Sequence, residues 1–292
     1  MKKIVSLAVC LTLALTLAGS AFAAEFDKTQ EITVISREAS SGTRGAFDEL
    51  MGILVKTDAG TEDRLFPEAV MVSSTDEVSA KVEVDAYAIG YTSLGAVTDK
   101  VKAVAVDTVE ATVENVKAGT YKISRPFVLA LPKTSENALA KDFLAFVTSK
   151  QGQEIVTAGG YINSVEEAAD YVAAGLTGKL TFSGSTSVEK VMEKLKEAYA
   201  VLNPNVAVEI TYNGSSAGIK DVTEGKVDIG MSSRALKEAE AEVLEPTVFA
   251  HDGIAVIVNT ANETSALTSE QITAIFTGEL RTWDAVEAVP AK

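Results

Sequence analysis

Three short segments rich in serine, threonine and glycine each follow a strand-like run and precede a helical pattern: 40–43, 183–187 and 213–218. A helix N-terminus presents unpaired backbone N–H groups and the positive end of the helix dipole, so it can bind an anion without a basic side chain. Glycine lets the backbone approach a ligand, and hydroxyls add donors. Serine and threonine are also the preferred N-cap residues, so one such turn indicates only a cap. Three of them together predict an oxyanion site.

Arg37 lies four residues before Ser41, just after the strand-like run 32–35. Its planar, permanently charged guanidinium could donate charge-assisted hydrogen bonds to an oxyanion. The alternative is an ordinary ion pair with Glu38 or another acid. The position at a strand end, beside a serine and glycine turn, makes Arg37 the candidate cation of the site.

The segments between these turns alternate β-branched runs with helical periodicity, which predicts an α/β fold with parallel strands joined by helices. After the second turn, one apolar helical face is formed by Val188, Met192, Leu195 and Tyr199. We expect a fully buried strand at 254–258 and a helix at 142–156. The alanine- and acid-rich stretch 164–178 is predicted to be a helix and linker between two blocks.

The composition is that of an ordinary globular protein with a strong acidic excess. The 292 residues predict about two domains. Asp and Glu total 41 against 26 Lys and Arg, a net charge of −15. Because this field repels phosphate backbones and no basic stripe is present, we expect no nucleic-acid partner.

Residues 1–23 have the pattern of a signal peptide: Lys2 and Lys3, an apolar run at 4–17, and small residues ending at Ala23. The apolar run is shorter than the roughly 20 residues that a spanning helix needs, so we expect no membrane insertion. The only cysteine, Cys10, lies inside this leader, so the mature chain would have no disulfide and no thiolate. Ser20 stands where a lipoprotein leader has cysteine, which predicts a free, periplasmic protein.

Arg37 with Ser41-Gly42-Thr43 resembles the arginine and SGT signature of the phosphate-binding proteins of phosphate ABC transporters, the PstS type. The resemblance extends over nearly all of the mature chain. Further segments similar to the family are 88–95, 124–126, 151–153, 182–188, 214–218, 228–234, 252–256 and 276–278 with Trp283. The family implies a two-lobed α/β periplasmic binding protein of type II, with the ligand cleft between the lobes. It implies capture of inorganic phosphate for a membrane ABC permease, with no cofactor and no bound metal.

The order of the segments differs from the family pattern, in which the turn now at 183–187 comes first. The resemblance therefore predicts a circular permutation whose two ends lie side by side, since the family continues from the Trp283 region into the strand that begins here at Glu31. One lobe would combine 25–121 with 259–292, and the other would be 122–258. We expect a monomer; the alternative is a domain-swapped dimer in which each chain supplies two half-sites.

The family site implies eight phosphate-binding residues, four from each lobe: Arg37, Ser41, Gly42 and Thr43, and Thr186, Ser187, Ser215 and Ser233. Two departures concern charge. Many members have an aspartate in place of Ser233, which accepts the proton of hydrogen phosphate and repels sulfate. Where many members place an acid partner for the arginine, this chain has Ala39, and Glu38 either replaces that acid or faces solvent.

Other functions fit the sequence less well. A serine hydrolase needs a general base, and the sole histidine, His251, directly precedes the expected buried strand. No metal-ligand spacing and no phosphate loop ending in Gly-Lys-Ser occurs, so we expect no catalytic residue. The same helix ends would serve sulfate, molybdate or an organic phosphate equally well. An exported sensor that lost transport would be expected to lose Arg37 or the SGT turn, and both are present.

Overall fold

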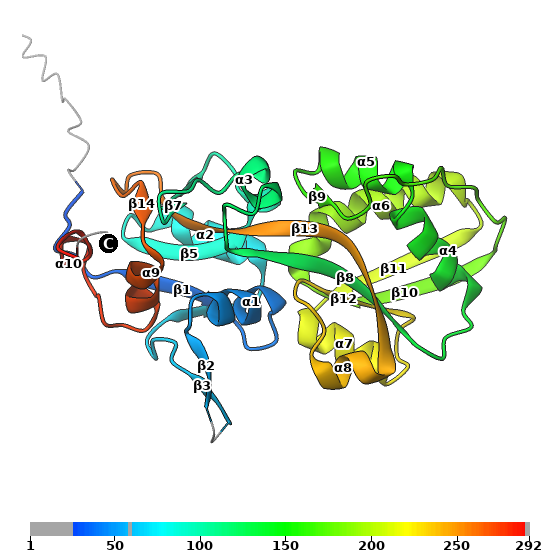
Figure 1. The fold of residues 1–292 in the computed structure, drawn as a ribbon, viewed down its shortest axis with the longest axis horizontal. Helices are drawn as coiled ribbons and strands as arrows, with labels where there is room; N and C mark the ends of the chain where they lie inside the picture. The colour runs from blue at the N-terminus through cyan, green and yellow to red at the C-terminus, as the bar shows by residue number, and fades with distance from the viewer. Residues whose placement is uncertain (1–25, 58–59, 290–292) are drawn as a thin grey trace, which may run out of the picture.

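A computed structural model describes residues 26–57 and 60–289. The predicted signal peptide at 1–23, with Cys10 and Ser20, lies outside the described residues. The chain forms two α/β lobes side by side along the long axis of the molecule (Figure 1), each with its own apolar core. Within the described chain, none of the helices combines the length and apolar character needed to cross a membrane.

The first lobe contains the N-terminal strands and helices together with the C-terminal helices. Its elements are β1 (Thr33–Arg37), α1 (Gly42–Leu50), β2 (Leu54–Thr57), β3 (Gly60–Asp63), β4 (Val70–Val72), α2 (Thr75–Val84), β5 (Ala88–Ser93), the 3-10 turn η1 (Leu94–Ala96), β6 (Val101–Ala103), β7 (Ala105–Val106), α3 (Val113–Lys117), β14 (Ala266–Leu267), α9 (Ser269–Phe276) and α10 (Trp283–Glu287). Strand β1 lies between β4 and β5 and is parallel to both. The first turn, 40–43, therefore leaves the carboxyl end of an inner strand and opens α1.

The second lobe is built from the middle of the chain. Its elements are α4 (Ala138–Val147), α5 (Lys150–Ala158), β9 (Ile162–Asn163), β10 (Gly178–Gly184), the 3-10 turn η2 (Thr186–Val188), α6 (Glu189–Leu202), β11 (Val206–Tyr212), α7 (Ser215–Thr223), β12 (Ile229–Ser232) and α8 (Glu238–Val243). Strand β10 is parallel to β11 and β12, as predicted for strands joined by helices. The apolar face predicted after the second turn is buried in this lobe's core, where Met192 and Tyr199 are fully covered.

Two long strands join the lobes: β8 (Ser124–Pro132) and β13 (Leu244–Asn259). Both are antiparallel to their neighbours, so the sheet is mixed rather than parallel throughout. Strand β13 pairs with β8 from Leu244 to Gly253 and with β5 from Ile254 to Val258. The sheet thus continues from one lobe into the other, in the order β11-β10-β12-β8-β13-β5-β1-β4.

Two predicted helices differ from the structure. The helix expected at 142–156 is divided into α4, which ends with Thr148 as its C-cap, and α5, whose N-cap Ser149 accepts a hydrogen bond from the Gly152 N–H. The stretch 164–178 forms no helix: residues 164–177 connect β9 to β10 as irregular backbone, and Gly178 begins β10. Alanine and glutamate favour helix by propensity, but most of this stretch is exposed, including Val172, so little packing against the lobe is available to stabilise a helix.

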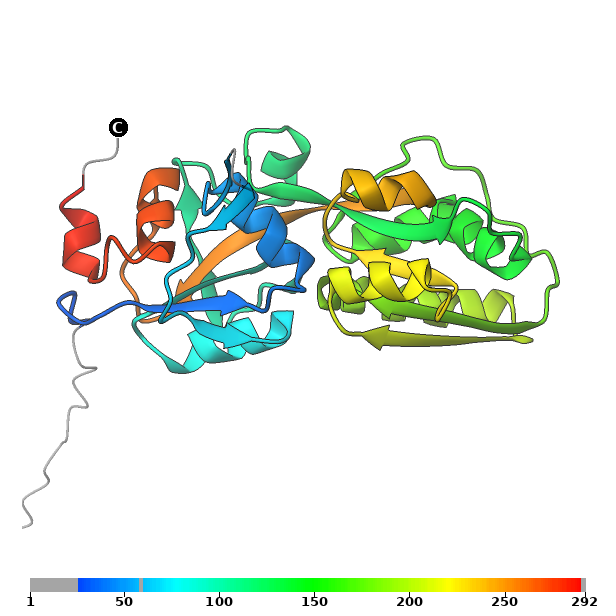
Figure 2. The ribbon, with the colours of Figure 1, turned by 90° about the horizontal axis from the view of Figure 1, so that it is seen from below.

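The two ends of the described chain lie side by side, as expected from the sequence. The Ile32 N–H donates to the Arg281 carbonyl at 2.7 Å, and the Asp284 N–H donates to the Lys28 carbonyl at 2.9 Å. The ammonium of Lys28 lies 2.7 Å from Glu287 Oε1. Figure 2 shows the N-terminal segment running beside helix α10 at this edge of the first lobe.

Candidate functional site

The predicted site residues meet where the two lobes face each other. Figure 2 shows α1 of the first lobe and α7 of the second approaching end to end at this junction. The contact is close: a Cβ atom on Gly42 would lie 2.2 Å from Ser215 Oγ and 2.9 Å from Ser233 Oγ. Only glycine fits at the start of α1 in this arrangement, so the backbone of one lobe reaches the hydroxyls of the other.

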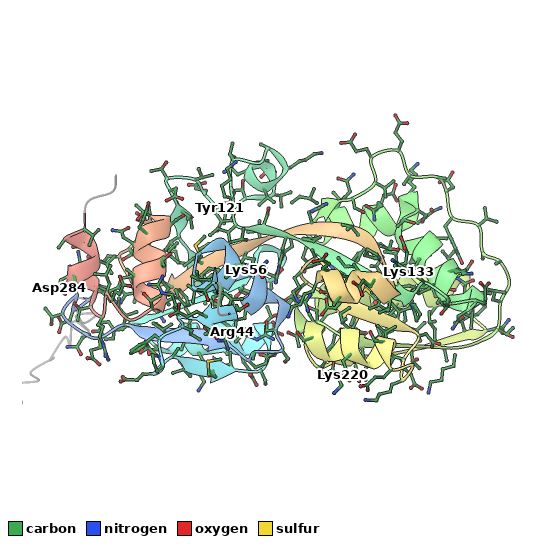
Figure 3. The ribbon with its side chains drawn as sticks, turned by 60° about the horizontal axis from the view of Figure 1, so that its bottom comes forward. Arg44, Lys56, Tyr121, Lys133, Lys220 and Asp284 are labelled. Carbon is green, nitrogen blue, oxygen red and sulfur yellow. The ribbon has the colours of Figure 1, made fainter. Side chains whose placement is uncertain are left out.

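Arg37 ends strand β1 and is 1% exposed. Its backbone N–H donates to the Tyr91 hydroxyl at 3.2 Å, and that hydroxyl also lies 2.9 Å from Ser36 Oγ. Arg44, labelled in Figure 3, donates from Nη1 to the Arg37 carbonyl at 3.2 Å and pairs with Asp48 at 3.1 Å. Burial raises the pKa of Tyr91, so its hydroxyl stays neutral. These contacts fix the backbone that holds the guanidinium.

Glu38 is the acid partner of Arg37. The Arg37 Nε and Nη2 atoms donate to Glu38 Oε2 and Oε1 at 2.8 and 2.9 Å, a bidentate pair. Of the two alternatives for Glu38, the structure therefore shows the ion pair. Glu38 replaces the acid that many family members have at the position of Ala39. Arg37 makes three further donations, from Nη1 to Thr75 Oγ1 at 3.2 Å and from Nη2 to the Ser73 carbonyl at 3.2 Å and to Thr186 Oγ1 at 3.1 Å.

A cluster of hydroxyls from both lobes surrounds the guanidinium. Thr43 Oγ1 lies 2.6 Å from Ser187 Oγ. Thr75 Oγ1 lies 3.0 Å from the same Ser187 oxygen and 3.3 Å from Thr186 Oγ1. Hydroxyl groups both donate and accept, so these side chains can bond one another and can reorient to donate to an anion.

Ser215 and Ser233 form the second half of the cluster. Ser215 is the first residue of α7, and its Oγ accepts a hydrogen bond from the Ser233 N–H at 3.1 Å and lies 3.3 Å from Ser233 Oγ. Both side chains are fully buried. Ser41, by contrast, is the N-cap of α1 and accepts from the Arg44 N–H at 3.2 Å. Its hydroxyl therefore has the capping role that a single such turn predicts.

The structure thus brings seven of the eight predicted residues into close approach across the lobes, and one chain supplies both halves; the eighth, Ser41, lies beside Gly42 as the N-cap of α1. It also adds Thr75, which the prediction missed. A signal was present, because Ser73-Ser74-Thr75 directly precedes the helical pattern of α2 and forms a fourth hydroxyl-rich turn of the same kind.

The chemistry of this arrangement is anion binding. Arg37, several hydroxyls and the N-termini of α1, α2 and α7 supply donors, and the one carboxylate bonded to the cluster, Glu38, is occupied by Arg37 within the described chain. His251 lies on β13 opposite Pro126 and Ile162, and among the described residues no hydrogen bond joins it to a serine. A serine–histidine pair for hydrolysis is therefore not assembled there.

Two α/β lobes that share a sheet through two long strands, with helix N-termini converging between them, define a two-lobed periplasmic binding protein. In agreement, the family model for the PBP superfamily domain matches residues 20–151 and 171–292. The chain is 45% identical over 256 residues to the phosphate-binding protein PstS 2 of Streptococcus pneumoniae, covering 88% of each chain. It is 43% identical over 254 residues to PstS 2 of Streptococcus agalactiae, covering 86% of each.

A solved structure, the phosphate-binding protein of a phosphate ABC transporter from Streptococcus pneumoniae, matches with a TM-score of 0.72 at 45% identity. The match covers 88% of this chain and 99% of that one. The chain belongs to the PstS family of phosphate-binding proteins.

The same comparisons bear on the order of the segments. Because the match to the streptococcal PstS 2 proteins extends over 88% of both chains, this chain has the same order as those relatives. The predicted circular permutation concerns only family members that begin with the turn found here at 183–187. It is not confirmed by these matches and stays a prediction.

Proposed function

We propose that this chain captures inorganic phosphate outside the cytoplasm and delivers it to a membrane ABC permease. The observation that supports this most directly is a hydrogen bond between the lobes. Arg37 Nη2 in the first lobe donates to Thr186 Oγ1 in the second at 3.1 Å. An oxyanion bound there would contact both lobes at once. The streptococcal relatives, which are named as phosphate-binding proteins, support phosphate as that oxyanion.

The proposed mechanism is hinge closure. Four residues bind phosphate from the first lobe: Arg37, Ser41, Gly42 and Thr43. Residues of the second lobe close on the same anion: Thr186, Ser187, Ser215 and Ser233. Because contacts to both lobes exist only in the closed form, phosphate shifts the population towards it. Several charge-assisted hydrogen bonds of roughly 1.5 to 3 kcal/mol each can supply the about 8 kcal/mol of a micromolar site before ordering costs.

The remaining features of the proposal follow from the resemblance and from the sequence. The chain acts as a monomer that is exported by the leader at 1–23 and cleaved near Ala23, and it is a binding protein without catalytic activity, cofactor or metal. The lobe limits proposed are 25–121 with 259–292, and 122–258.

The experiment is a calorimetric titration of the mature, phosphate-stripped protein, first with phosphate and then with sulfate, near pH 7. We expect one tight phosphate site per chain. Phosphate is partly protonated at this pH and sulfate is not, so the sulfate titration shows whether Ser233 in place of aspartate still allows discrimination. Absent phosphate binding, or equal binding of sulfate, would contradict phosphate capture as the function.

A further inference from the structure

Thr75 stands out because its hydroxyl contacts the proposed site from a helix that the sequence analysis did not assign to it. Thr75 is the first residue of α2, a ten-residue helix, and is 5% exposed. Its Oγ1 lies within hydrogen-bonding distance of the Arg37 guanidinium, of Ser187 and of Thr186. These three partners come from both lobes, and all three belong to the proposed phosphate site.

The hydroxyl of Thr75 has no function in its own helix. The N-cap of α2 is Ser74, whose side chain accepts a hydrogen bond from the Glu77 N–H at 3.2 Å. Ser73 is held separately by the Glu77 carboxylate through its N–H and its hydroxyl. Since capping is complete without Thr75, helix formation does not explain why a hydroxyl is buried at this position.

The direction of the hydrogen bonds shows what this hydroxyl can do. A guanidinium has only donors, so Arg37 Nη1 donates to Thr75 Oγ1. Accepting that bond leaves the Thr75 proton free to be donated onward, towards Ser187 or Thr186 or an anion between them. A hydroxyl that accepts from a cation is polarised and becomes a stronger donor to an anion.

We propose that Thr75 is a ligand-binding residue that donates its hydroxyl proton to an oxygen of a tetrahedral oxyanion held by Arg37. This inference rests on the proposed function, because it adds a residue to the same site. Thr75 brings the N-terminus of α2 to the anion beside that of α1. In the first lobe, Thr75 then adds a hydroxyl donor to those of Ser41 and Thr43, since the Ser41 oxygen that accepts from the Arg44 N–H still carries a proton to donate.

The test compares inorganic phosphate binding by the wild-type protein and three variants in calorimetry. Thr75→Val keeps the shape of the side chain and removes the hydroxyl, so we expect phosphate to bind about 10- to 100-fold more weakly. Thr75→Ser keeps the hydroxyl and should stay within about threefold of wild type. The matched control is Ser79→Ala, one turn further along α2, where the hydroxyl has no hydrogen-bond partner in the described chain; its affinity should not change.

Thermal unfolding without ligand shows whether each variant is folded, and Thr75→Ala replaces the valine variant if that one is not. Wild-type affinity in the variant without a hydroxyl would overturn the role of Thr75. So would an equal loss in Thr75→Ser, because that variant keeps the hydroxyl and the loss of affinity would then not depend on it. A wild-type protein that binds no phosphate would instead contradict the proposed function, and the two failures are therefore distinguishable.

Discussion

At the scale of single residues, Arg37 is the only guanidinium bonded to the hydroxyl cluster in the part of the chain that the structure describes. Arg37→Ala should weaken phosphate binding by about 2 kcal/mol, or roughly 30-fold, because it removes charge-assisted donors. It also leaves the Glu38 carboxylate unpaired beside the anion. Calorimetry on the folded variant measures the loss, with Arg64→Ala as the control, since Arg64 forms an exposed pair with Glu279. Unchanged affinity in the Arg37 variant would remove this residue from the site.

Asp48 makes the stability of the first lobe depend on pH. Burial raises its pKa from 3.8 to about 6, although the Arg44 ion pair opposes the shift. The folded state thus binds the proton more tightly than the unfolded state, so this contribution to stability is lost as pH rises towards and through 6. From pH 5 to pH 7 the free energy of unfolding should fall by about 1 kcal/mol more in wild type than in Asp48→Asn. Urea unfolding at both pH values measures this, and parallel changes in the two proteins would contradict it.

The residues of the site were largely predictable from sequence, and the one residue that was missed has a physical explanation. Arg37 and the serine, glycine and threonine turns were recognisable by type and spacing. The ion pair of Arg37 with Glu38 was one of two alternatives that the sequence left open, because adjacent residues on a regular strand point to opposite faces and the pair forms only where the strand ends. Thr75 was missed because its turn follows β4, a strand of only three residues, which is too short to show the alternation that marks a strand in the sequence.

At the scale of elements, the site depends on how closely α1 and α7 approach. Gly42→Ala should leave the first lobe as stable as before or more stable, since alanine favours helix. Its Cβ would nevertheless lie 2.2 Å from Ser215 Oγ, so the closed form must be strained by about 1 to 3 kcal/mol. We expect phosphate affinity to fall about 10-fold or more.

The control for this variant is Gly45→Ala on the same helix, where the added Cβ makes an ordinary contact at 3.7 Å with Arg234. Calorimetry and thermal unfolding of both variants separate closure from helix stability. If the Gly42 and Gly45 variants bound phosphate equally well, the close approach of the two helices would not be part of the bound form.

The elements themselves were predicted well where an apolar pattern was strong and poorly where it was absent. The face of α6 and the buried strand at 254–258 follow directly from periodicity and hydrophobicity. The break between α4 and α5 depends on one capping serine, which a continuous helical pattern hides. The antiparallel direction of β8 and β13 is a property of the long-range topology, which local sequence does not specify.

At the scale of the whole molecule, a buried ion pair joins the two long strands that connect the lobes. Arg125 on β8 and Asp252 on β13 are cross-strand partners, with Nη2 and Oδ2 3.1 Å apart and both side chains 1% exposed or less. Asp252→Asn leaves the arginine charge buried and unpaired, so we expect the free energy of unfolding to fall by about 3 to 5 kcal/mol. Chemical denaturation measures this free energy of unfolding. The control is Lys179→Gln, because Lys179 forms an exposed ion pair with Glu209. A loss no larger than that of the control would show that the pair is not needed where the strands cross.

The central claim is that a single chain closes hydroxyls of both lobes around one phosphate ion. The most direct measurement is a crystal structure of the mature protein with phosphate. We predict one phosphate per chain, within hydrogen-bonding distance of Arg37 and of hydroxyls from each lobe, among them Thr43 and Ser215. A phosphate bound to one lobe only, or shared between two chains, would contradict the account.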